Sequence, residues 1–133
     1  MRKVGIWIDH RKAVVVTIDG GQESQQVVES DIDDVTGPEG SRRTSTAYGP
    51  QAKDVERQVQ DKKRHHLARF YKDIVKRIGK PDQLLVIGPA EAKREFAELA
   101  EKDPALRGVK IKLEPADRMT DAQIAAKVRE TDV

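Results

Sequence analysis

Apolar residues in the N-terminal part of the chain fall into short runs that are typical of β-strands. Residues 4–9 and 13–18 are rich in β-branched side chains, and the polar stretch between them predicts a hairpin. The second run ends at Asp19-Gly20, a dipeptide that readily takes the positive φ angles of a tight turn. A third strand is therefore expected through residues 26–28, and its polarity places it at the edge of a sheet.

The next segments of the chain show helical spacing and then a buried strand. Apolar residues recur at three- and four-residue intervals, which predicts an amphipathic helix from about Gln51 to Ile78, ended by Gly79-Lys80-Pro81. Residues 84–87 form a continuous apolar run, as in a strand buried on both faces. Gly88-Pro89 is expected to begin a second helix with proline in its first turn.

The C-terminal part predicts one more strand and one more helix. Apolar and charged residues alternate over 109–114, which indicates a strand with one solvent-facing side. Thr120 and Gln123 have the spacing of a capping box, and Met119 and Ile124 have that of a hydrophobic staple, so a last helix should begin there. The predicted element order is βββαβαβα.

This order predicts an α/β fold with a five-stranded mixed sheet. Right-handed crossovers make the last two strands parallel to their neighbours, and placing the first strand beside residues 84–87 gives the sheet order 3-2-1-4-5. By analogy, this order resembles the ribonuclease H-like architecture. A chain of 133 residues, 37% of them hydrophobic, fits one domain over residues 1–133. Residues 31–50 lack apolar periodicity and are expected to form a long mobile loop.

Composition excludes several classes of function. The chain has no cysteine, which removes thiol catalysis, iron–sulfur clusters and cysteine zinc sites, and favours a cytoplasmic location. The N-terminal apolar run is too short for a signal peptide or a membrane span, so no membrane partner is expected. Two Phe, two Tyr and one Trp offer few platforms for stacking single-stranded bases.

The charge is distributed unevenly along the chain. Residues 42–80 carry twelve Lys or Arg against four acids, a local charge of +8 in a chain whose net charge is +2. Such a segment suits a phosphate backbone, although a solvated helix face has the same composition. The candidate RNA-binding residues are Arg42, Arg43, Lys53, Arg57, Lys62, Lys63, Arg64 and Arg69, with His65 and His66 assisting.

Metal-dependent chemistry is the alternative from a different class. Nucleases of the ribonuclease H-like fold place a metal-binding carboxylate at the end of the first strand, where this chain has Asp9. Its partners would be Glu91 with Asp117 or Asp121, but each of these acids also has an ordinary role in a turn or at a helix start.

The adjacent His65 and His66 point about 100° apart on a helix and do not chelate one metal, so no cofactor is expected.

Residues 85–96 resemble part of a known protein family. Their sequence, Leu-Val-Ile-Gly-Pro-Ala-Glu-Ala-Lys-Arg-Glu-Phe, resembles a strand and helix unit in the central domain of eukaryotic and archaeal release factors and of the ribosome-rescue protein Pelota. Residues 70–75 resemble the helix that leads into that unit. With the opening hairpin around residues 5–13, most of the chain resembles the bacterial and archaeal release-factor-like (translational machinery) proteins.

The catalytic tripeptide of release factors is not found where this resemblance would place it. In that family the release loop lies between the third strand and the first long helix, and the matching residues 36–51 contain no Gly-Gly-Gln. Gly20-Gly21-Gln22 lies in a different connection, where a tight turn itself requires the glycines. Peptide release is therefore not expected.

The resemblance is then closest to the central domain of Pelota, which lacks the tripeptide and lies against ribosomal and transfer RNA. We expect a non-catalytic protein that binds the ribosome or structured RNA. The sequence leaves two other functions open, a metal-dependent nuclease and a module that pairs through the edge strand Gln22 to Glu29. It does not determine the oligomeric state.

Overall fold

A computed structural model describes residues 2–32 and 49–131, with the backbone alone for residues 49–55. The predicted loop at 31–50 therefore lies largely outside the described residues. The elements are β1 (Arg2–Ile8), β2 (Lys12–Asp19), β3 (Gln22–Glu29), α3 (Gly49–Ile78), β4 (Gln83–Gly88), α4 (Ala92–Lys102), the 3-10 helix η1 (Pro104–Leu106), β5 (Lys110–Pro115) and α5 (Asp121–Glu130). The predicted order of strands and α-helices is confirmed in the described residues, with η1 as an addition.

The five strands form one mixed sheet in the order β3-β2-β1-β4-β5, as the sequence predicts. β1 pairs antiparallel with β2 and parallel with β4, so Ile6 lies between Val15 and Val86. β2 pairs antiparallel with β3, and β4 pairs parallel with β5. β1 and β4 are buried along almost their whole length, whereas β3 and β5 are mostly exposed edge strands.

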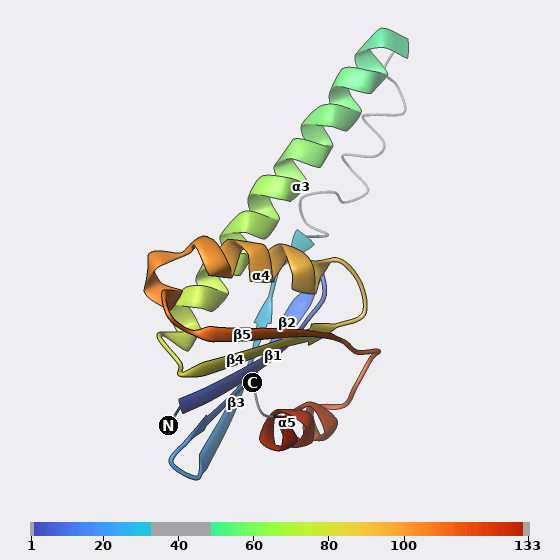
Figure 1. Ribbon diagram of the computed structural model, residues 1–133. Helices are drawn as coiled ribbons and strands as arrows, with labels where there is room; N and C mark the ends of the chain where they lie inside the picture. The colour runs from blue at the N-terminus through green and yellow to red at the C-terminus, as the bar shows by residue number, and fades with distance from the viewer. Residues whose placement is uncertain (1, 33–48, 132–133) are drawn as a thin grey trace.

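Helices cover both faces of the sheet (Figure 1). α3 and α4 lie on one face and α5 lies on the other. The larger core packs Phe70, Ile74 and Ile78 of α3 and Phe96 of α4 against β1, β2 and β4. The smaller core packs Ile124 and other residues of α5 against Trp7 and its neighbours. The molecule is thus a three-layer α/β domain.

Local sequence signals explain both how α5 starts and how closely it packs. Thr120 and Gln123 form the predicted capping box, with the Thr120 Oγ1 accepting from the Gln123 N–H at 3.1 Å and the Gln123 Oε1 accepting from the Thr120 N–H at 2.9 Å. Gly5 on β1 lies directly beneath Val128, where a Cβ would collide with the valine side chain. Glycine at this position lets α5 approach the sheet closely.

The predicted start of the second long helix is wrong. α4 begins at Ala92, so Pro89 lies in the connection before the helix rather than in its first turn. Gly88 still belongs to β4, and its carbonyl accepts from the Ala116 N–H at 2.9 Å. Because the strand extends to Gly88, the chain needs residues 89–91 to turn before a helix can begin.

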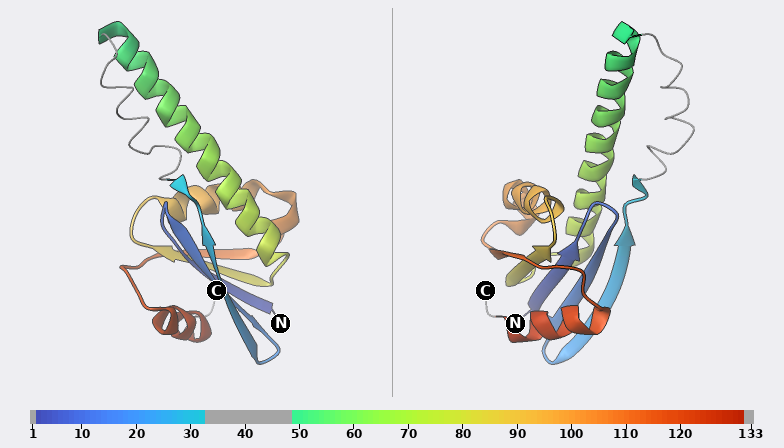
Figure 2. Two further views of the ribbon diagram at one scale, coloured as in Figure 1. Left: turned by 180° about the vertical axis from the view of Figure 1, so that it is seen from behind. Right: turned by 90° about the vertical axis from the view of Figure 1, so that its right-hand side faces the viewer.

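The longest helix extends well beyond the sheet (Figure 2). α3 has 30 residues and is about 45 Å long at 1.5 Å per residue. Its C-terminal half is packed in the core, whereas its N-terminal half projects away from the other elements. Within the described residues, no helix combines the length and apolarity needed to cross a membrane. The N-terminal half of α3 thus extends into solvent beyond the core.

Candidate nucleic-acid interface and an adjoining cavity

The solvent-facing side of α3 carries an unbroken row of basic residues, which we call the outer stripe. Its members follow a three- and four-residue spacing that places them on one helix face, and all are exposed. They are Lys62, His65, Arg69, Lys72 and Lys76. The stripe is about 21 Å long at 1.5 Å per residue.

The charges of the outer stripe are not neutralised by neighbouring acids. Asp61 pairs with Arg64 at 3.7 Å and Asp73 pairs with Arg77 at 3.0 Å, so both acids are matched to other residues. Within the described residues, no side chain of the stripe forms an ion pair. The stripe thus presents a row of basic side chains without ion-pair partners to solvent.

Other predicted RNA-binding residues lie elsewhere. Lys63 and Arg64 point to the opposite side of α3, toward a cavity. Arg57 is exposed and lies six residues before Lys63 on the same helix. Arg42 and Arg43 lie outside the described residues, and for Lys53 only the backbone is described. The structure therefore divides the predicted basic cluster between two faces of one helix.

His66 differs from its neighbour His65. The Nε2 atom of His66 is hydrogen-bonded to the backbone carbonyl of Ser30, whereas His65 is exposed. Ser30 is itself held by its hydroxyl, which donates to the His10 carbonyl at 2.5 Å. His66 thus ties α3 to the end of β3 and the β1–β2 turn.

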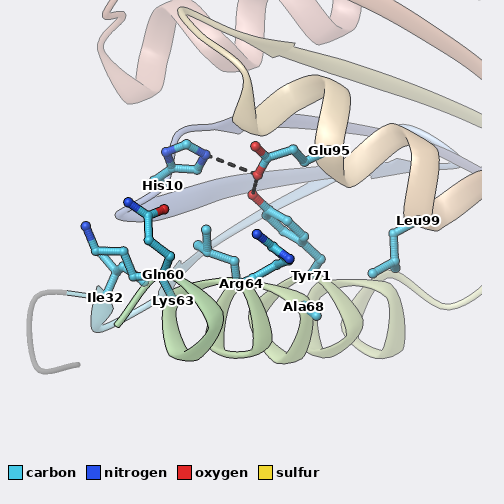
Figure 3. Close-up of a pocket in the computed structure, with 10 residues that line it drawn as sticks. His10, Ile32, Gln60, Lys63, Arg64, Ala68, Tyr71, Glu95 and Leu99 are labelled. Atoms are coloured by element: carbon cyan, nitrogen blue, oxygen red, sulfur yellow. Dashed lines mark hydrogen bonds and ion pairs between the residues drawn. The ribbon is translucent and has the colours of Figure 1, made fainter. Parts of the chain in front are cut away.

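An open cavity of about 590 Å³ lies between the inner face of α3, α4 and the β1–β2 turn (Figure 3). Lys63 and Arg64 of α3 line one side, and Glu95 of α4 and His10 of the turn line the other. Leu67 and Leu99 supply an apolar wall. The sequence gives no sign of this cavity, because its walls come from segments that are up to 89 positions apart in the chain.

Glu95 is fixed in place by two hydrogen bonds to a single carboxylate oxygen. The Tyr71 hydroxyl donates to Glu95 Oε1 at 2.7 Å, and the His10 Nε2 donates to the same oxygen at 3.1 Å (Figure 3). Burial raises the pKa of Tyr71 far above its usual value, and the hydrogen bond and negative charge of Glu95 raise it further. Tyr71 is therefore a neutral donor, and Glu95 keeps its second oxygen for another partner.

The four acids of the nuclease hypothesis do not come together. Asp9 Oδ1 accepts from the backbone N–H groups of Arg11 and Lys12, both at 2.8 Å, which closes the β1–β2 turn. Glu91 lies 3.8 Å from Arg94 at the start of α4. Asp117 and Asp121 offer their backbone carbonyls to Trp7 and Gln25. Among the described residues, no group of three His, Cys, Asp or Glu side chains is arranged to hold a metal ion.

The Gly-Gly-Gln tripeptide is part of a hairpin. Gly20 and Gly21 form the β2–β3 turn with φ angles of +57° and +89°, and Gln22 is the first residue of β3. Two consecutive positive φ angles are what a tight two-residue hairpin turn requires. The turn conformation therefore accounts for both glycines.

Comparison with known proteins adds information at the level of the fold. No family model matches the sequence, and no curated protein matches it. Among solved structures, Pelota from Thermoplasma acidophilum superposes with a TM-score of 0.54 at 16% sequence identity, over 99% of this chain and 33% of that one. The fold is similar to part of Pelota. An archaeal translation termination factor, aRF1, superposes with a TM-score of 0.49 at 13% identity, over 95% of this chain and 37% of that one.

The match to Pelota covers nearly all of this chain but only part of Pelota. The chain spans about a third of the length of Pelota, so the likeness concerns one part of a larger protein. Nearly all of the present chain takes part in it, which supports the α/β fold that the sequence predicts. At this identity the likeness concerns the fold alone.

Proposed function

We propose that this protein binds structured RNA, in the context of the ribosome, through the outer stripe of α3, and that it does so without catalysing a reaction. The observation that carries the proposal is the row of exposed basic residues on the outer face of α3, none of which is paired with an acid in the described residues. Phosphate groups are the natural partners of such a row, and their contacts position a protein on RNA without reading its sequence.

The distribution of aromatic residues supports folded RNA over single strands as the ligand. Single-stranded nucleic acids are held by exposed aromatic rings on which bases stack. In the described residues, all four aromatic side chains, Trp7, Phe70, Tyr71 and Phe96, are buried. Recognition through helix shape and phosphate position needs no exposed ring.

The link to translation rests on the fold. The solved structure of Pelota shares this α/β arrangement. We propose accordingly that the protein works in the cytoplasm on the ribosome. The proposal also includes Arg42, Arg43, Lys53 and Arg57 as RNA-contacting residues.

Co-sedimentation with ribosomes and with a free structured RNA, over a series of salt concentrations, tests this proposal. The informative variant is Lys62→Gln/Arg69→Gln/Lys76→Gln, the stripe variant, since glutamine keeps helix propensity while removing three charges. Its matched control is Arg107→Gln/Lys110→Gln/Arg118→Gln, which removes three exposed cations distant from α3 in the sequence. We expect the stripe variant to lose binding and the control to keep it.

Equal loss of binding in both variants would mean that only net charge matters, and the proposed surface would be wrong. Absence of wild-type binding at low salt would refute RNA binding itself. Binding to free RNA but not to ribosomes would separate RNA recognition from the link to translation.

A further inference from the structure

The cavity between α3 and α4 is lined by basic, acidic and apolar side chains, whereas the outer stripe is basic only. Lys63 and Arg64 bring two positive charges from α3. Glu95 brings a hydrogen-bond acceptor from α4 on the other side, and Leu67 and Leu99 bring an apolar surface. A ligand that uses all of them needs an anionic end, a donor group and an apolar part.

The cations at the cavity are available to a ligand. Lys63 is half-buried and has no acidic partner among the described residues. Arg64 has only Asp61, at 3.7 Å, and its side chain is 78% exposed, so this pair contributes little. Figure 3 shows both side chains rising from α3 on the side that faces α4. A phosphate bound there would replace a weak surface ion pair with charge-assisted hydrogen bonds.

Glu95 is prepared to accept a hydrogen bond from a ligand. Its Oε1 atom already accepts from Tyr71 at 2.7 Å and from His10 at 3.1 Å. Tyr71 is 4% exposed and its ring packs edge-on against Phe96 with the centroids 6.0 Å apart, so the donor cannot move away easily. No partner for Oε2 is found among the described residues, which leaves this oxygen for a hydroxyl or an amine.

We infer that the cavity binds a nucleoside monophosphate unit, with the phosphate at Lys63 and Arg64 and a sugar hydroxyl or base amine donating to Glu95. The base then contacts Leu67 and Leu99. A volume of about 590 Å³ lies within the range of small-ligand pockets and exceeds what a lone phosphate needs. The same chemical unit exists as a free nucleotide and as a residue within RNA, and only the second source rests on the proposed function.

Titration with the four ribonucleoside 5′-monophosphates, followed by amide chemical shifts, tests this inference. We expect shifts at residues 60–71 of α3 and 95–99 of α4, and about tenfold weaker binding in both Arg64→Gln and Glu95→Gln. Ala68→Met, which fills the cavity from the α3 side, should also abolish the shifts while keeping the fold. The Arg107→Gln/Lys110→Gln/Arg118→Gln control should bind like the wild type.

A second titration, with a structured RNA, distinguishes this inference from the proposed function. If the RNA binds but no mononucleotide shifts the cavity residues at millimolar concentration, the cavity inference is wrong and the stripe proposal stands. If mononucleotides bind and structured RNA does not, the cavity is a free-nucleotide site and the proposed function is wrong. If Arg64→Gln and Glu95→Gln leave mononucleotide affinity unchanged, the ligand lies elsewhere and the inference fails.

Discussion

The two halves of α3 share one continuous helix but have opposite surroundings. In the C-terminal half, Phe70, Ile74 and Ile78 are at most 5% exposed and belong to the main core. In the projecting half, residues 56–66 contain no buried side chain. A helix that protrudes into solvent gains little from packing, and most helical stability in proteins comes from packing. The outer stripe begins at Lys62 in the projecting half and continues to Lys76 on the solvent side of the core half, so the proposed RNA surface spans both halves.

The largest expected difference between the halves is in folding stability. Ile74→Ala removes a fully buried side chain and should lower the free energy of unfolding by about 2–5 kcal/mol. Val59→Ala, in the projecting half, should cost less than about 1 kcal/mol because Val59 is only half-buried. Urea denaturation measures both, and similar losses would show that the projecting half is packed as firmly as the core half.

Hydrogen exchange should separate the two halves within one protein. Amides over residues 70–78 should exchange through global unfolding, whereas those over 56–66 should exchange through local opening. We expect protection to differ by at least about 100-fold, which corresponds to about 2.7 kcal/mol. Adding structured RNA should raise protection in both segments, because the outer stripe runs from Lys62 to Lys76 and a ligand of the folded state also opposes global unfolding. Uniform protection along α3 would show that the two halves are equally stable, contrary to this prediction.

Tyr71 lies in the core half of α3, and its replacement should have a smaller effect than Ile74→Ala. Tyr71→Phe removes the hydrogen bond to Glu95 and should cost about 1 kcal/mol at neutral pH. Because the pKa of Tyr71 is raised in the folded state, the wild type should lose stability as the pH rises above about 10, where the unfolded tyrosine ionises. Tyr71→Phe should lack this part of the loss, so the two stabilities should converge in alkaline denaturation experiments.

Local patterns in the sequence account for most of the fold. The capping box at Thr120, the glycine turn at Gly20 and the apolar run of β4 depend on neighbours within a few residues, and each prediction is confirmed. The predicted start of α4 is wrong because proline statistics do not reveal that β5 keeps Gly88 in the sheet.

The candidate sites were harder to predict than the fold. The seven-residue repeat of Lys62, Arg69 and Lys76 is a sequence signal that separates the outer stripe from Lys63 and Arg64. The contact of His10 with Glu95 joins residues 85 positions apart, so no local pattern announces it. Helix periodicity thus reveals which face a charge occupies, but not which distant element faces it.

The salt dependence of RNA binding tests the central claim most directly. Affinity for one structured RNA would be measured over a range of salt concentrations for the wild type, the stripe variant and the three-charge control. Each lost phosphate contact lowers the slope of log affinity against log salt by about 0.7 to 0.9, so the stripe variant should show a slope shallower by about 2 to 3 and the control an unchanged slope. A stripe variant with the wild-type slope would show that the outer stripe of α3 does not contact the phosphates.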